Sequence, residues 1–115
     1  MEIITQPDTH TMQARAPEPL LALPLEQKIG QLLYIGLPGT ELDADARALV
    51  EEINPGGIII FGRNVAAPRQ LRELLDAVRE CVPCEPLCGI DQEGGLVDRQ
   101  RKICTPMPWL PALSS

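Results

Sequence analysis

The pattern of apolar and polar residues divides the chain into a leader and a segment of alternating elements. Residues 1–24 contain four prolines (Pro7, Pro17, Pro19 and Pro24) and show no sustained hydrophobic period. Such a segment is typical of mobile or extended chain. From residue 25 onward, helical spacing of apolar residues alternates with short continuous apolar runs, which predicts helices and strands in turn.

Three helices are predicted. The first starts at Leu25. The second has Thr40 as its N-cap, followed by acidic residues near the positive end of the helix dipole, and it ends at residues 54–56, where a proline interrupts the hydrogen-bond ladder. The third begins at Pro68, a residue suited to the first turn, and stops at Pro83. The predicted apolar faces comprise Leu25, Ile29, Leu32 and Leu33; then Leu42, Ala46, Leu49, Val50 and Ile53; then Leu71, Leu74, Leu75, Val78 and Val82.

Three strands are predicted over residues 32–36, 57–61 and 86–90. Strands that are apolar at every position are usually buried on both faces, as in a parallel sheet covered by helices. Alternating helices and strands with short connections favour right-handed βαβ units. We therefore expect an α/β fold with about three parallel strands: either a small open layer or part of a TIM (β/α)₈ barrel, which takes about 250 residues when complete.

Composition and charge narrow the possible partners. The net charge is −6 and the sequence pI about 4.7, which excludes a basic nucleic-acid-binding surface. No apolar run is long enough to span a membrane, and the chain does not start with a basic and then apolar secretion signal. The expected location is therefore the cytoplasm.

The stretch with the most chemical content follows the third predicted strand. Asp91, Gln92 and Glu93 come directly after the apolar run, two glycines follow, and Arg99 lies close behind. Barrel enzymes build their active sites at this end of a strand. Carboxylates accept hydrogen bonds from sugar hydroxyls and arginine donates them, so the pattern suits sugar recognition. A polar turn with a solvated arginine would give the same pattern, and an aromatic content of 3% leaves few rings for sugar stacking.

Several motifs together resemble a known family. Residues 25–113 resemble the N-terminal barrel domain of glycoside hydrolase family 3, and in particular the bacterial β-N-acetylhexosaminidases. The matching pieces are Leu25-Glu26-Gln27-Lys28-Ile29-Gly30-Gln31-Leu32, Gly39-Thr40-Glu41-Leu42, Pro55-Gly56-Gly57-Ile58-Ile59-Ile60-Phe61-Gly62-Arg63-Asn64, Gln70-Leu71-Arg72-Glu73-Leu74, Ile90-Asp91-Gln92-Glu93-Gly94-Gly95 and Thr105-Pro106-Met107-Pro108.

The resemblance implies a role for particular residues. Asp91 would bind hydroxyls of the sugar in the −1 subsite, and Arg99 would contribute to the same pocket. Glu93 and the glycines would shape the loop, and Asn64 would have a structural role. Leu96 departs from the family, which usually has arginine after the two glycines.

The resemblance also implies an activity: hydrolysis of terminal β-linked N-acetylglucosamine, plausibly from peptidoglycan fragments, without metal or organic cofactor. Retaining glycosidases need a nucleophile and an acid/base. In this branch these are an aspartate and a histidine in later sequence, after a Lys-His-Phe-Pro-Gly-type segment. The only histidine here is His10, in the leader. We therefore expect residues 25–115 to be a truncated barrel that binds sugar weakly and has no catalytic residue.

Two hypotheses of other classes remain open. The chain could be a non-catalytic sugar-binding or subunit module, which would self-associate through unpaired sheet edges. Alternatively, Cys81, Cys84, Cys88 and Cys104 could bind zinc or carry out redox chemistry, although zinc sites favour two separated Cys-x-x-Cys pairs and only one is present. Without an export signal we expect reduced thiols, with Cys88 packed as a small buried group.

Overall fold

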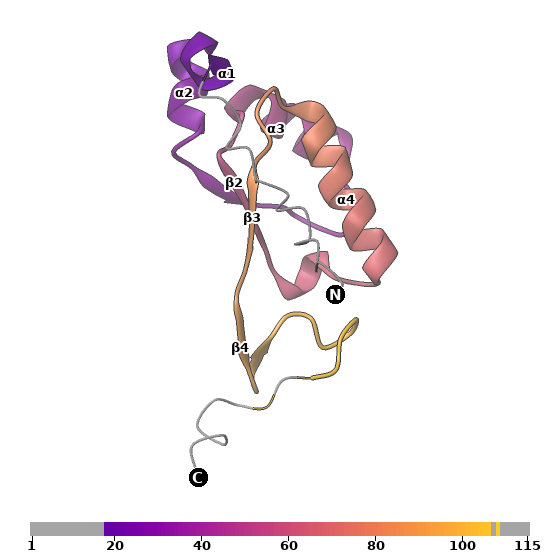
Figure 1. The fold of residues 1–115 in the computed structure, drawn as a ribbon. Coiled ribbons are helices and arrows are strands. Elements are labelled where there is room, and N and C mark those ends of the chain that lie inside the picture. Colours follow the sequence, from indigo (N-terminus) through magenta and orange to yellow (C-terminus); the bar gives the residue numbers. More distant parts are fainter. Residues whose placement is uncertain (1–17, 107, 109–115) are drawn as a thin grey trace, which may run out of the picture.

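A computed structural model describes residues 18–106 and 108, and it has a three-stranded parallel sheet with helices against it (Figure 1). The strand order is β1-β2-β3, and a second, two-stranded antiparallel sheet follows β3. The elements are α1 (Glu18–Ala22), α2 (Leu25–Gly30), β1 (Tyr34–Gly36), α3 (Ala44–Ile53), β2 (Gly57–Ile60), the short 3₁₀ helix η1 (Gly62–Asn64), α4 (Pro68–Cys81), β3 (Leu87–Ile90), β4 (Gln92–Gly94) and β5 (Val97–Asp98).

This arrangement confirms the α/β prediction and its three parallel strands. One element, α1, falls in the segment for which the sequence predicted no regular structure. The remainder of that segment, including His10, lies outside the described residues.

Helix α3 starts later than predicted. The side chain of Asp43, not of Thr40, caps it: Asp43 Oδ1 accepts a hydrogen bond from the backbone N–H of Ala46 at 2.8 Å. Asp43 is extended and stands directly before the first helical residue, which is the position from which a short side chain reaches the free N–H groups of the first turn. The predicted C-terminal stop is confirmed, since Asn54 ends the helix in the left-handed conformation with φ of 48°.

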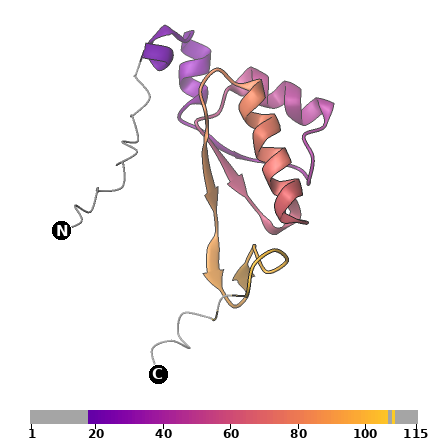
Figure 2. The ribbon, with the colours of Figure 1, turned by 45° about the vertical axis from the view of Figure 1, so that its right-hand side comes forward.

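Helices α3 and α4 lie on the same side of the sheet (Figure 2). Pro68 occupies the first turn of α4, as predicted, and the apolar stripe of that helix faces the strands. The core between helices and sheet consists of Leu37, Val50, Ile58, Ile60, Val65, Leu74 and Val78. Ile58 and Ile60 alternate with Ile59 along β2, so one face of the sheet supplies the buried positions.

Only the middle strand is buried as predicted. β2 has a neighbour on each side, whereas β1 and β3 are edges, so Tyr34 is 54% exposed and Leu87 is 66% exposed. Cys88 is also exposed, which corrects the expectation of a buried thiol. Exposure of β1 and β3 follows from their position at the edges of the sheet, because an apolar strand is buried only where neighbouring strands and helices cover it.

Candidate functional site

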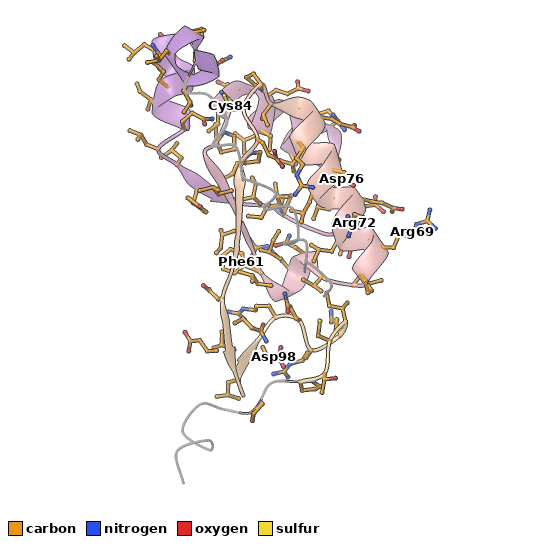
Figure 3. All side chains as sticks on the ribbon, in the orientation of Figure 1. Phe61, Arg69, Arg72, Asp76, Cys84 and Asp98 are labelled. Carbon is orange, nitrogen blue, oxygen red and sulfur yellow. The ribbon has the colours of Figure 1, made fainter. Side chains whose placement is uncertain are left out.

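The candidate site lies where β2 and β3 end. The last paired residues of these strands are Ile60 and Ile90, so Phe61 and Asp91 are the next residues along two adjacent parallel strands. By alternation, both belong to the face opposite Ile60, which packs into the core. Figure 3 shows Phe61 at this end of the sheet and Asp98 in the segment beyond it.

Asp91 has a free carboxylate. Its side chain is exposed, and it makes no hydrogen bond or ion pair with another residue of the described part of the chain. A carboxylate at the carboxyl end of a parallel strand, with all its acceptor positions unused, is available to a ligand.

The residues after Asp91 form a hairpin, not the loop that the sequence predicted. β4 and β5 pair antiparallel, with Gln92 opposite Asp98. Gly94 and Gly95 make the turn with φ of 80° and 57°, a region that favours glycine. The strands on either side of this turn were missed because they are only three and two residues long.

Gln92 holds the hairpin together. Its Nε2 donates to Asp98 Oδ1 at 2.7 Å, and its Oε1 accepts from the backbone N–H groups of Arg99 at 3.0 Å and Gln100 at 3.4 Å. Asp98 is only 6% exposed. Glu93, which was expected to shape this segment, is exposed and bonds to no other described residue. From the sequence, Gln92 was named in the polar stretch without a structural role, and Asp98 was not singled out. The signal for this bond was a pair of polar residues on opposite sides of a Gly-Gly turn.

Arg99 lies between the hairpin and the end of β2. Its Cδ is 3.8 Å from where a Cβ on Gly62 would stand, so its side chain passes beside the first residue of η1. Its Nε is buried and has no hydrogen-bond acceptor among the described residues. Burying a guanidinium N–H without an acceptor costs free energy, so a ligand oxygen that accepted from this atom would be bound favourably.

Asn64 has the structural role that was expected of it. It is fully buried, and its Nδ2 donates to the carbonyls of Leu37 at 3.1 Å and Gly39 at 2.7 Å. Its Oδ1 accepts from the N–H of Phe61 at 2.9 Å. These bonds tie the segment after β1 to the segment after β2, and they leave Asn64 no free group for a ligand.

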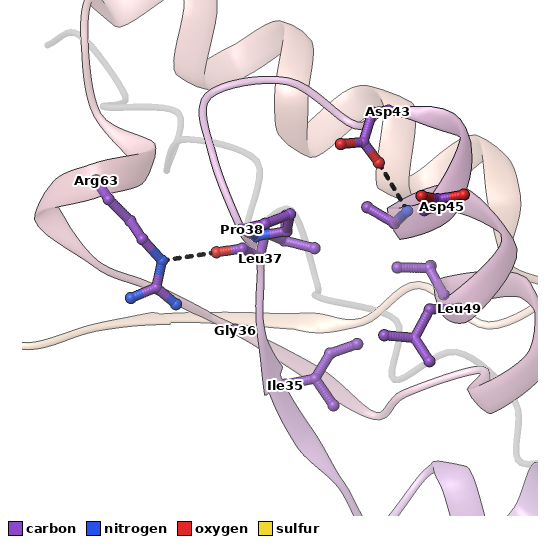
Figure 4. A pocket seen from close by; sticks show the side chains of 10 residues that line it. Ile35, Gly36, Leu37, Pro38, Asp43, Asp45, Leu49 and Arg63 are labelled. Carbon is purple, nitrogen blue, oxygen red and sulfur yellow. Dashed lines mark hydrogen bonds between the residues drawn. The ribbon is translucent and has the colours of Figure 1, made fainter.

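Two hollows adjoin these segments. One, of about 410 Å³, is lined by residues 93–97 at the hairpin tip, where Leu96 is 96% exposed. The other, of about 490 Å³, follows the free edge of β1 and is mainly apolar, with Asp43, Asp45 and Arg63 at its rim (Figure 4). Asp43 already caps α3 in that hollow, and Arg63 donates to Leu37.

The four cysteines lie apart from one another as metal ligands. All four are free thiols, and across residues 18–106 no three histidine, cysteine or acidic side chains gather closely enough to hold a metal ion. Burial raises the pKa of the Cys81 thiol, although Arg47 opposes the shift. Desolvation likewise raises the pKa of Cys88. No helix in the described part is long and apolar enough to cross a membrane.

A family model decides the relationship. The model described as the glycosyl hydrolase family 3 N terminal domain matches residues 24–115, which includes every element of the sheet and the hairpin. The chain belongs to glycosyl hydrolase family 3.

Individual family 3 relatives share the same region. A β-hexosaminidase from Alkalilimnicola ehrlichii is 42% identical over 76 residues, covering 66% of this chain and 22% of the relative. One from Pseudomonas aeruginosa is 39% identical over 82 residues, covering 71% of this chain and 24% of the relative. The solved structure of a family 3 β-N-acetylglucosaminidase from Paenibacillus sp. str. FPU-7 superposes with a TM-score of 0.73 at 42% identity, over 80% of this chain and 18% of that one. This chain thus spans less than a quarter of the length of these relatives.

Proposed function

We propose that this chain supplies part of the sugar-binding site of a β-N-acetylglucosaminidase, with Asp91 and Arg99 as ligands of a terminal N-acetylglucosamine. One observation carries the proposal: the exposed Asp91 carboxylate after β3 has no partner among the described residues, and Arg99, directly after the hairpin, has a buried Nε with no acceptor among them. The names of the family 3 relatives supply the class of sugar.

The chemistry of the two side chains fits a neutral sugar. The Asp91 carboxylate accepts hydrogen bonds from hydroxyl groups, and the Arg99 guanidinium donates to hydroxyl or carbonyl oxygen. The polar groups around them are already used, because Gln92 bonds to Asp98 and Asn64 bonds to backbone carbonyls. Gln92, Asp98 and Asn64 therefore hold the backbone of the site in place, and the side chains of Asp91 and Arg99 are available to bind the ligand.

Hydrolysis is proposed for the whole enzyme and not for these 115 residues. His10 is the only histidine, and it lies outside the described residues. Asp91 and Glu93 are two residues apart on one extended segment, so they would meet a ligand from the same strand. A glycosidase instead needs two carboxyl groups, or equivalent groups, that flank the bond to be broken.

Sugar binding by the isolated chain tests the role of Asp91. N-acetylglucosamine should shift the amide resonances of the hairpin in a nuclear magnetic resonance titration, with a dissociation constant in the millimolar range. D91N should weaken binding about tenfold, because hydrogen bonds to a charged acceptor are the stronger kind. D76N is the matched control, since Asp76 is an exposed carboxylate on α4 whose surface ion pair contributes little.

The same samples separate binding from turnover. The chain should leave 4-nitrophenyl N-acetyl-β-D-glucosaminide intact over hours. Turnover that survives purification would contradict the assignment of catalysis to other residues of the enzyme. Equal affinity in D91N and the unsubstituted chain would contradict the binding role.

We also propose that the isolated chain self-associates through its sheet edges. Tyr34–Gly36 of β1 and Leu87–Ile90 of β3 each pair on one side only, and Leu32, two residues before β1, is 83% exposed. Unpaired strand edges with apolar side chains are templates for further pairing.

Sedimentation velocity should therefore show a mass that rises with concentration. A charge on the edge, in L87K, should reduce the association, whereas L96K should not, because Leu96 is as exposed but lies on the hairpin tip. A monodisperse monomer at every concentration would overturn this proposal.

A further inference from the structure

A second arginine is held in a defined orientation, just after the end of β2. Arg63 lies in η1, directly after β2, and its Cζ is 4.6 Å from the centroid of the Phe61 ring. Its Nε donates to the carbonyl of Leu37 at 2.9 Å. A cation over an aromatic face together with a fixed hydrogen bond restrains a side chain that would otherwise sample many rotamers.

The neighbouring strand leaves space for this stack. Gly36 ends β1, and a Cβ there would stand 3.0 Å from the Phe61 ring and 3.1 Å from Arg63 Nη2. Both distances are tighter than ordinary van der Waals contact, so any larger residue at this position would displace the ring or the guanidinium. The absence of a side chain at Gly36 is what allows the Phe61–Arg63 pair to lie across the end of the sheet.

The pair lies next to the proposed sugar ligands. Phe61 follows Ile60 as Asp91 follows Ile90, and adjacent strands are about 4.8 Å apart. On its other side, the Arg99 side chain passes Gly62, the residue between Phe61 and Arg63. The guanidinium of Arg63 itself lies on the β1 side of Phe61, against Gly36 and Leu37, so Arg63 and the two proposed ligands stand at the same end of the sheet.

The remaining donors of Arg63 are free. The side chain is exposed, and its two terminal nitrogens make no hydrogen bond or ion pair within the described residues. A guanidinium whose Nε is anchored presents its Nη groups as a planar fork with little further loss of entropy.

We propose that Arg63 is a further substrate-positioning residue of this site, which donates an Nη hydrogen bond to the saccharide that Asp91 and Arg99 hold, while the Phe61 ring supports its guanidinium. The inference rests on the proposed function and deepens it. It adds a ligand from the segment after β2 to Asp91, which follows β3, and to Arg99, which follows β5.

A titration of the whole 115-residue chain with N-acetylglucosamine tests it. The Arg63 Nε–Hε resonance, visible because Nε is hydrogen-bonded, should shift with the same dissociation constant as the Asp91 amide. R63Q should weaken binding about fivefold or more, because it removes a charge-assisted donor. R69Q is the matched control, since Arg69 has a side chain 91% exposed and pairs only with Glu73 on the surface of α4.

The outcomes separate the two proposals. If the Asp91 amide shifts but the Arg63 resonance does not, and R63Q binds as tightly as the unsubstituted chain, Arg63 is no ligand and the proposed function stands. If neither resonance shifts at saturating sugar, both proposals fail. Because the resonance is measured on the unsubstituted chain, the test holds even if R63Q folds poorly.

Discussion

Replacing Gly30 by alanine is expected to destabilise the chain by about 3 kcal/mol or more, a large part of the roughly 5–15 kcal/mol that stabilises a typical domain. Gly30 ends α2 and is buried against the end of α3. A Cβ at this position would collide with the carbonyl oxygen of Ile53, which is backbone and cannot turn aside as a side chain could. Loss of the helical circular dichroism signal, and a lower midpoint in urea, would show the effect.

Gly39 provides the matched control. No atom lies within 4 Å of where its Cβ would stand, so G39A should unfold at the same urea concentration as the unsubstituted chain, or slightly above it. If G30A and G39A proved equally stable, the close approach of α2 to α3 would not exist in solution. The same logic applies to Gly56, whose Cβ would meet the carbonyl oxygen of Gln31.

Replacing Asn64 by alanine should have the second large effect, about 3 kcal/mol. The substitution removes three hydrogen bonds and strands two groups, the carbonyl of Gly39 and the N–H of Phe61, whereas the carbonyl of Leu37 keeps its bond from Arg63. Each lost bond that strands a buried polar group costs about 1 kcal/mol or more. Because these bonds align the ends of β1 and β2, N64A should also lose sugar binding in the fraction that still folds.

Asn54 offers a comparison with the same substitution. It is likewise fully buried, but its side-chain nitrogen and oxygen have no partner among the described residues. N54A therefore removes no hydrogen bond of its side chain, and it should cost only about 1 kcal/mol for placing alanine in the left-handed region. Urea unfolding of N64A and N54A measures the free energy of unfolding that each substitution removes. Equal losses in the two variants would show that the Asn64 hydrogen bonds contribute nothing specific to stability.

Most of the element order could be predicted because its signals are local. A proline cannot continue a helix, so residues 54–56 and Pro83 mark the ends of α3 and α4 wherever those helices pack. The N-cap of α3 could not be predicted from such local signals. Threonine and aspartate are both good N-caps, and only the backbone conformation selected Asp43.

The candidate site was predictable in part. The position of Asp91 after an apolar run was enough to place it at the carboxyl end of a strand. The hairpin was missed because strands of two and three residues contain no measurable period. The bonds of Gln92 were missed for a related reason, since they depend on the register of the hairpin.

The sequence by itself determined the α/β class, the three strands and the C-terminal ends of α3 and α4, because each follows from backbone preferences and hydrophobic spacing over a few residues. Only the tertiary structure decided which strand is buried, which groups remain free, and that Arg63 and Arg99 flank Phe61 and Gly62. Those properties depend on neighbours from distant parts of the chain. Ile58 and Leu87 both belong to apolar runs, yet one is buried and the other exposed because β2 has a strand on each side and β3 has only one.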